Sequence, residues 1–96
     1  YVAYENGNIG ALSKRNGMVE WESNALFARG LTRPVLINER IVVGDQEGYV
    51  HVLDKNSGQL LGSTKVGKSG FMPDVLAISG SAIFQDHSGN VYRISI

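Results

Sequence analysis

The sequence predicts an all-β fold in which one unit of short antiparallel strands is repeated, and three observations predict it. Similar residues recur at an interval of 41 positions, as in Gly7, Gly48 and Gly89. Runs rich in β-branched and apolar residues, such as Arg40–Gly44 and 49–53, alternate with turn-forming segments. No window of useful length has the apolar periodicity of a helix. Several short strands in each 41-residue unit are typical of a β-propeller blade.

The elements of the unit can be assigned in order along the chain. Ile41, Val42 and Val43 are apolar in succession, which predicts a strand buried on both faces, as in blades that stack face to face. Gly58 is free to take a positive φ at the end of a turn. The only helical candidate, 23–29, is short and lacks a cap. The other expected elements are turns over 45–48 and 54–58, a weaker strand over 59–64, and strands over 75–78 and 81–84 that flank a turn at 79–80.

The repeat predicts about two and a third blades in the 96 residues. We expect a partial blade over 1–24, a complete blade over 25–66 and a partial last blade over 67–96. The chain begins without Met inside an apolar stretch, so we expect the natural protein to be longer. Incomplete blades leave unpaired strand edges, which predicts self-association by edge pairing or strand swapping.

Composition and charge argue against several function classes. Nine basic and nine acidic residues cancel, which argues against a nucleic-acid partner. The chain has no cysteine, and His51 and His87 do not occupy equivalent repeat positions, so no metal site is expected. Asp45 and Asp86 are equivalent, which favours turn capping over catalysis. Serines are plentiful, but no Gly-x-Ser-x-Gly elbow accompanies them. We therefore predict no catalytic residue, no bound cofactor and no enzymatic activity.

The segment 11–21 carries a recognisable motif. It resembles the quinoprotein-type propeller repeat, Ala-x-Asp-x-x-Thr-Gly-x-x-x-Trp, with Ser13 in place of Asp and Asn16 in place of Thr. Both replacements are turn formers. The motif implies that Trp21 packs on the neighbouring blade. In the second copy Gly62 stands at the tryptophan position, so one contact between blades should be weaker there.

Longer segments narrow the resemblance. Four segments are similar to the C-terminal blades of the BamB family, namely residues 31–38, 41–51 and 86–94 and the turn at 69–71. The resemblance implies an eight-bladed propeller of the quinoprotein-like type in a periplasmic lipoprotein of Gram-negative outer membranes. It implies a subunit of the β-barrel assembly machinery that binds the periplasmic POTRA domains of BamA, other Bam subunits and nascent outer-membrane proteins. The lipidated cysteine of that family would lie outside this chain.

Two alternatives stay open. The chain could be a piece of a quinoprotein dehydrogenase, which shares the repeat but needs cofactor and metal residues in its central funnel. It could equally belong to a generic interaction propeller with another partner. Quinone absorbance in the parent protein would identify the first, and a lipoprotein signal in the full gene would argue against the second.

The candidate partner-binding residues lie in the connection 27–33. Arg29 and Arg33 stand beside Leu31 and Thr32 in a segment that precedes an inner strand. Propellers present such connections on one face, where partners bind. We predict that Arg29, Leu31, Thr32 and Arg33 contact a protein partner; the alternative is a solvated loop in which Arg33 pairs locally. The equivalent connection in the next unit, 65–71, is a weaker candidate.

Overall fold

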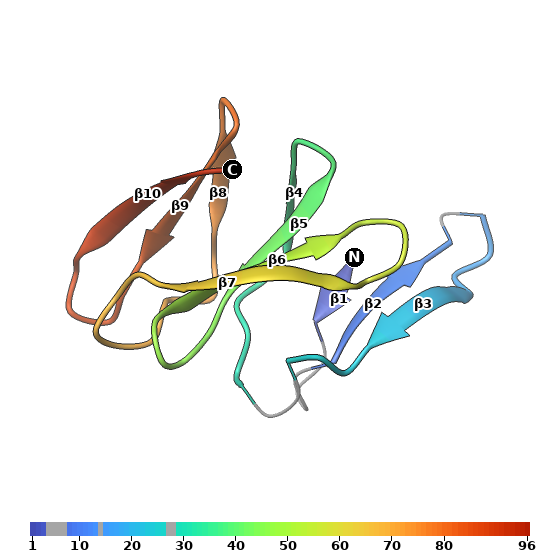
Figure 1. The fold of residues 1–96 in the computed structure, drawn as a ribbon, viewed down its shortest axis with the longest axis horizontal. Helices are drawn as coiled ribbons and strands as arrows, with labels where there is room; N and C mark the ends of the chain where they lie inside the picture. Colours follow the sequence, from blue (N-terminus) through green and yellow to red (C-terminus); the bar gives the residue numbers. More distant parts are fainter. Residues whose placement is uncertain (4–7, 14, 27–28) are drawn as a thin grey trace.

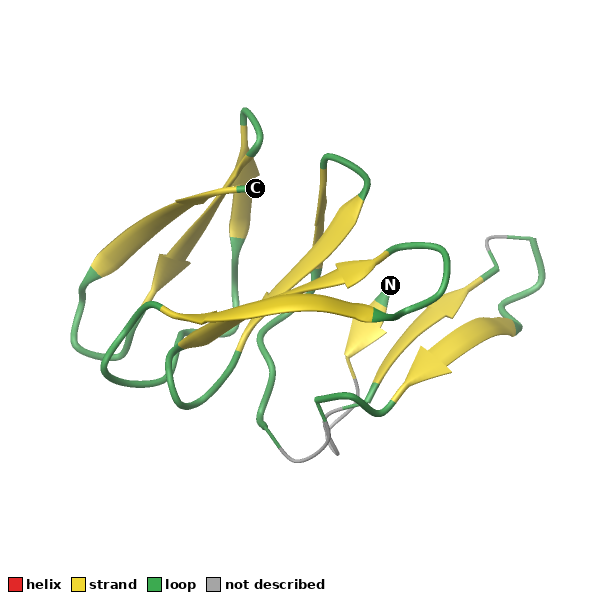
Figure 2. Ribbon diagram, viewed as in Figure 1, coloured by secondary structure: helices red, strands yellow, loops and turns green. Residues whose placement is uncertain are grey.

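A computed structural model describes residues 1–3, 8–13, 15–26 and 29–96, and these residues form three antiparallel sheets without a helix (Figures 1 and 2). The predicted all-β, antiparallel fold is thus confirmed. Each sheet is formed by strands that are consecutive in the sequence, as expected for blades. The strands are β1 (Val2–Ala3), β2 (Ile9–Leu12), β3 (Val19–Ser23), β4 (Val35–Ile37), β5 (Arg40–Gly44), β6 (Tyr49–Asp54), β7 (Leu60–Lys65), β8 (Leu76–Ile78), β9 (Ser81–Gln85) and β10 (Val91–Ser95).

The middle sheet is the most complete of the three. Its strands lie in the order β4-β5-β6-β7, and the sheets on either side are β1-β2-β3 and β8-β9-β10 (Figure 1). The strands predicted over 40–44 and 49–53 correspond to β5 and β6. The weaker strand predicted over 59–64 corresponds to β7, which is exposed along its whole length.

The apolar core lies in the two gaps between the three sheets. One cluster joins the first and middle sheets, and the other joins the middle and last sheets. Ile41 and Val43 of β5 belong to the first cluster, whereas Val42 between them belongs to the second. All three side chains are completely buried. Both faces of β5 are therefore covered, which explains its unbroken apolar run.

The turns that close the outer hairpins repeat from one sheet to the next. In the first, Ser13 Oγ accepts a hydrogen bond from the amide of Arg15, and Asn16 Oδ1 accepts one from Met18. In the second, Asp54 Oδ1 accepts from the amides of residues 56 and 57, and Ser57 Oγ accepts from residue 59. Gly17 and Gly58 end these turns with φ values of 70° and 76°. The polar replacements in the motif thus preserve the turn, as the sequence predicts.

Trp21 makes the contact between blades that the motif implies. Its indole Nε1 donates a hydrogen bond to the Lys55 carbonyl at 2.9 Å, across to the next sheet. The ring lies against Gly58, where an added Cβ would come within 2.5 Å of Trp21 Cε3. Gly58 therefore serves two purposes, a positive φ and a close approach of the indole. At Gly62, the repeat equivalent of Trp21, an added Cβ would meet nothing within 4 Å, so the space that a tryptophan would occupy is open, and the weaker contact there stays a prediction.

The helical candidate over 23–29 is wrong within the described residues. Ser23 ends β3, and Ala25 and Leu26 lie in a turn, with Leu26 buried in the core. Residues 27 and 28 lie outside the described part of the chain. The apolar side chain of Leu26 fills the gap between two sheets, so it needs no helical face to bury it. The described residues include no helix long and apolar enough to cross a membrane.

Candidate functional site

The predicted partner-binding connection is only partly available on the surface. Phe27 and Ala28, which begin it, lie outside the described residues. Thr32 is buried, and its hydroxyl accepts a hydrogen bond from the Gly44 amide at 2.9 Å. The Thr32 amide in turn donates to the Gly44 carbonyl. Leu31 is partly buried against the core. Thr32 thus binds the connection to the end of β5, and Leu31 packs it against the core. These contacts fix the backbone that carries the two arginines.

The two arginines of the connection lie in different surroundings. The side chain of Arg33 is 78% exposed and forms an ion pair with Asp74 at 2.7 Å. Asp74 lies 41 residues further on, at the equivalent place in the next repeat, so the pair joins two blades. An exposed pair of this kind contributes little to stability and leaves the Arg33 guanidinium accessible. Arg33 thus pairs with a residue of the next blade and not within its own loop, and it remains on the surface.

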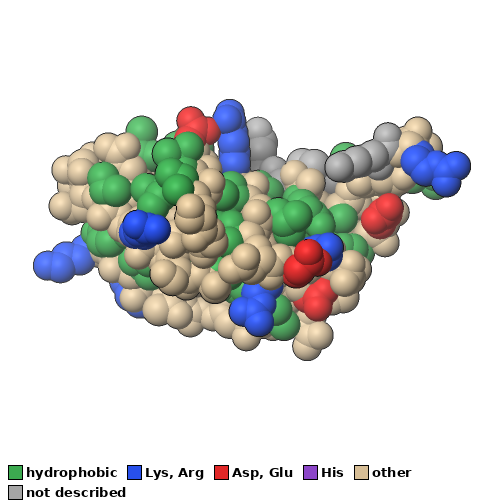
Figure 3. Space-filling model, turned by 90° about the horizontal axis from the view of Figure 1, so that it is seen from above, with side chains coloured by type: hydrophobic (Ala, Val, Ile, Leu, Met, Phe, Trp, Pro, Cys, Tyr) green, Lys and Arg blue, Asp and Glu red, His purple; other side chains and the backbone are tan. Residues whose placement is uncertain are grey.

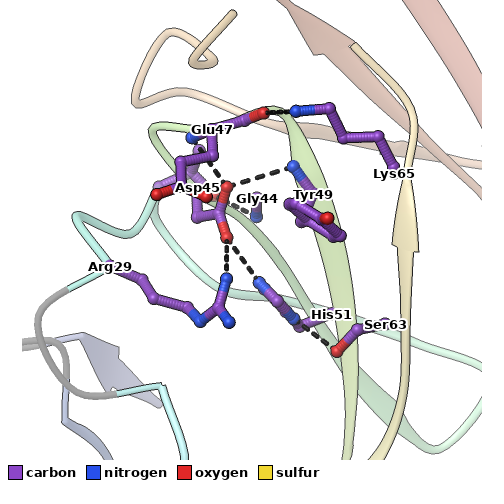
Figure 4. A network of polar contacts seen from close by, with 9 residues as sticks. Arg29, Gly44, Asp45, Glu47, Tyr49, His51, Ser63 and Lys65 are labelled. Atoms are coloured by element: carbon purple, nitrogen blue, oxygen red, sulfur yellow. Dashed lines mark hydrogen bonds and ion pairs between the residues drawn. The ribbon is translucent and has the colours of Figure 1, made fainter. Parts of the chain in front are cut away.

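Arg29 belongs to a network built around Asp45, at the end of β5 (Figure 4). Asp45 is buried. Its Oδ1 accepts hydrogen bonds from the amides of Glu47 and Tyr49 at 2.9 and 3.0 Å, which caps the turn before β6 as predicted. Its Oδ2 accepts from Arg29 Nη1 at 3.1 Å and from His51 Nε2 at 2.7 Å.

The environment of Asp45 favours its charged form. Burial alone would raise the pKa of this carboxyl group, but the hydrogen bonds from His51, Tyr49, Glu47 and Arg29 together hold the pKa below its ordinary value. Asp45 is thus a buried carboxylate with four donors around it.

His51 extends the network across the sheet. It is buried in mid-strand on β6, and its Nδ1 lies 2.6 Å from Ser63 Oγ on β7. In the tautomer with its proton on Nε2, His51 donates to Asp45, and Nδ1 accepts a hydrogen bond from the Ser63 hydroxyl. The sequence analysis missed this chain of contacts. A usable signal exists in the repeat, since Asp45 precedes His51 by six residues and Asp86 precedes Tyr92 by six.

The last sheet repeats the arrangement with a different side chain. Asp86 Oδ1 accepts hydrogen bonds from the amides of Ser88 and Asn90, and its Oδ2 accepts from the Tyr92 hydroxyl at 3.1 Å. Burial raises the pKa of Asp86, but its hydrogen bonds, above all those from Asn90, lower it overall. Burial and the contact with Asp86 raise the pKa of Tyr92. The turn capping predicted for Asp45 and Asp86 is therefore confirmed, and each aspartate also binds a side chain of the strand that follows its turn.

The contacts run from Asp45 to His51 and from His51 to Ser63, as in a nucleophilic triad, but the repeat indicates another role. The Tyr92 phenol takes the place of His51 in the last blade. A phenol hydrogen-bonded to a carboxylate has a raised pKa and is no general base near neutral pH. What the two copies share is a polar side chain that joins a buried aspartate to the strand after its turn. No group of three or more potential metal-ligating side chains occurs in the described part of the chain.

A basic and aromatic surface lies beside the network. Two cations lie near the Tyr49 ring, with Arg29 Cζ 5.7 Å and Lys65 Nζ 5.0 Å from its centroid. Lys65 also donates a hydrogen bond to the Glu47 carbonyl (Figure 4). Cation–π contacts of this kind hold long side chains in place while leaving their charge accessible. We call Arg29, Tyr49 and Lys65 the Tyr49 patch; sequence reasoning identified only Arg29, because the three residues are distant in the chain.

Known proteins resemble this chain in sequence along nearly its whole length. Outer membrane protein assembly factor BamB of Escherichia coli is 37% identical over 95 residues, which cover 99% of this chain and 24% of that protein. BamB of Taylorella asinigenitalis is 36% identical over 95 residues, covering 98% of this chain and 25% of the relative. The chain thus spans about a quarter of the length of these relatives. No protein-family model matches it.

Solved structures resemble the chain in fold. The crystal structure of BamB from Moraxella catarrhalis has a TM-score of 0.88 at 30% identity, covering 98% of this chain and 28% of that one. The computationally designed protein Ika4 has a TM-score of 0.80 at 18% identity and covers 98% of this chain and 57% of its own, which supports the fold alone. In sequence and in fold, the chain described here matches β-propeller blades that make up about a quarter of the outer membrane protein assembly factor BamB.

Proposed function

We propose that this chain is part of a BamB-like propeller and acts as a scaffold, without enzymatic activity, in the machinery that assembles outer-membrane β-barrels. The observation that carries the proposal is the match to BamB proteins over 98–99% of the chain, in sequence and in structure. The blades are 1–24, 25–66 and 67–96, and the parent protein is eight-bladed. It works on the periplasmic side of the outer membrane, where a lipid anchor holds it.

The proposed partner is the periplasmic POTRA region of BamA, alongside other Bam subunits and nascent outer-membrane proteins. The proposed contact surface comprises Arg29 and Arg33 with the neighbouring Tyr49 patch. Arginine and tyrosine are enriched in protein interfaces because each combines apolar area with directed polar groups. Leu31 and Thr32 support this surface from behind, since both are wholly or partly buried.

Calorimetric titration of this chain into purified BamA POTRA domains tests the proposal, with E. coli BamB titrated in parallel. We expect both proteins to bind. The double substitution Arg29→Ala and Arg33→Ala should weaken binding about tenfold or more, in line with the loss of two interface arginines. Arg93→Ala is the matched control, because Arg93 lies on the last blade and its Nε donates a hydrogen bond to Ser81 instead. Binding by E. coli BamB alone would contradict a contact surface on these blades.

A further inference from the structure

A cavity of about 390 Å³ lies between the middle and last sheets, beside Gly62. Its walls are mainly apolar and come from four strands, β5, β6, β7 and β10, with Val66 and Ile96 beside them, and we call it the Gly62 pocket. The polar side chains in the lining are those of Arg40, Ser63, Thr64 and Ser95. The lining residues are Arg40, Val50, Val52, Gly62, Ser63, Thr64, Val66, Ile94, Ser95 and Ile96.

The equivalent space in the preceding gap is filled by the side chain of Trp21. Trp21 and Gly62 are separated by the repeat interval of 41 residues and pair with equivalent partners, Ala11 and Val52. The repeat also relates the apolar surroundings of Trp21 to walls of the pocket. Ile9 and Leu53, in the cluster on which Trp21 packs, correspond to Val50 and Ile94. Trp21 thus fills the gap between the first and middle sheets, and the gap between the middle and last sheets lacks the equivalent tryptophan.

The polar partner of the indole has a counterpart as well. Trp21 Nε1 donates to the carbonyl of Lys55, and the residue 41 positions further on is Ile96, which lines the pocket. The backbone oxygen of Ile96 accepts a 3.3 Å hydrogen bond from Asn38 Nδ2, and this oxygen can accept a second one. The N–H group of a bound indole can therefore donate to Ile96, as Trp21 Nε1 donates to Lys55.

An incoming polypeptide can reach this pocket along β7. Within the described residues β7 is the outermost strand of its sheet, paired with β6 and exposed over all six residues. An extended segment that pairs with its free edge would set one side chain directly beside Gly62, on the same face of the sheet. Aromatic side chains are known to cover a glycine on a neighbouring strand.

We propose that the Gly62 pocket binds a tryptophan side chain that a partner polypeptide presents in an extended segment. The proposal deepens the scaffold function above and rests on it for the identity of the partner, which would be an unfolded protein rich in aromatic strand residues. The chemical class of the ligand, an indole with a donor N–H, rests on the seating of Trp21 alone.

Saturation-transfer NMR on the 96-residue chain with N-acetyl-tryptophanamide as the probe tests the pocket directly. The method observes the ligand, so the protein can be kept dilute. We expect transfer to the indole protons, and a much weaker effect with N-acetyl-leucinamide. Gly62→Trp should fill the pocket and lower the apparent affinity at least about tenfold. Leu61→Trp is the matched control, because residue 61 is exposed on the opposite face of β7 and should leave binding unchanged.

A smaller substitution keeps the test valid if Gly62→Trp does not fold. Gly62→Val adds a side chain where no atom lies within 4 Å, and it should weaken binding of the probe while keeping the fold. Absence of transfer to the indole, or equal transfer with Gly62→Val and the original chain, would overturn the proposal. Because this measurement uses no BamA, its failure is independent of the failure of the scaffold function.

Discussion

Glu39 occupies a backbone conformation that glycine takes in the next repeat. Asn38 and Glu39 join β4 to β5 with φ values of 48° and 67°, and Ser79 and Gly80 join β8 to β9 with values of 48° and 78°. A left-handed conformation costs an L-residue about 1–2 kcal/mol. Glu39 also forms an ion pair with Lys55, but its side chain is 78% exposed, so the pair offsets little of this cost.

Replacing Glu39 by glycine should therefore stabilise the chain. We expect the free energy of unfolding to rise by about 0.5–1 kcal/mol, because relief of the positive φ outweighs the added freedom of the unfolded chain. Urea denaturation followed by circular dichroism measures the change. Glu39→Gln is the control, since it removes the charge and keeps the strained backbone, and it should shift stability by less than about 0.5 kcal/mol. A loss of stability with glycine would contradict this account.

The buried carboxylate of Asp45 makes stability depend on pH. Its pKa is lowered in the folded chain, so its contribution is present above the unfolded pKa of about 3.9 and is lost as the pH falls through the folded value. The amide in Asp45→Asn cannot ionise and keeps only part of the hydrogen bonding. We expect this variant to be about 2 kcal/mol less stable at pH 7 and to lose less stability on acidification. Denaturation at pH 7 and at pH 3 tests both, and parallel pH profiles for the two proteins would refute the assignment.

At the scale of the elements, the sequence predicted most of the strands and turns because both have local causes. The β-branched runs of β5 and β6 and the turn residues around Gly58 act within a few positions of each other. The quinoprotein-type motif implied that Trp21 packs on the neighbouring blade, and the repeat then placed Gly62 at the tryptophan position of the second copy. The contacts of His51 with Asp45 and Ser63 were missed, because the registers of two strand pairs must be known to bring these groups together.

Trp21 should be the strongest single link between the first two blades. Trp21→Ala removes both the indole packing and the hydrogen bond to Lys55, and since the residue is only partly buried we expect a loss of about 2–3 kcal/mol. Trp21→Phe keeps an aromatic ring and loses the hydrogen bond, which should cost about 1 kcal/mol. Thermal or urea unfolding distinguishes the two variants. Equal losses for both would show that the ring contributes nothing beyond its N–H group.

At the scale of the whole molecule, the three sheets leave apolar surface and strand edges uncovered. Leu36 on β4 and Leu76 and Ile78 on β8 are 48%, 60% and 50% exposed. Apolar side chains are also exposed on the face seen in Figure 3. Within the described residues β10 pairs with β9 and forms the edge of its sheet, and Val91 on β10 is 65% exposed. Exposed apolar strands at a free edge favour pairing between copies.

The isolated 96-residue chain should therefore self-associate. We expect sedimentation velocity at micromolar concentration to show dimers or larger species in addition to the monomer. A charge on the free edge opposes pairing between strands, so Val91→Lys should shift the population toward the monomer. His87→Lys is the control, because it adds the same charge in the preceding turn, away from the strand. A single monomeric species in the original chain would rule out the prediction.

The burial of β5 on both faces has a consequence for strand register. In a strand with one apolar face, a slip of one residue turns every apolar side chain toward water, so the pattern itself selects the correct pairing. Ile41, Val42 and Val43 are interchangeable in this respect, and a slipped β5 would still present apolar groups to both gaps. The alignment of the middle sheet therefore depends on the ends of β5, namely the left-handed turn at Asn38 and Glu39, the aspartate-capped turn at Asp45, and Gly44, where an added Cβ would come within 2.5 Å of Phe71.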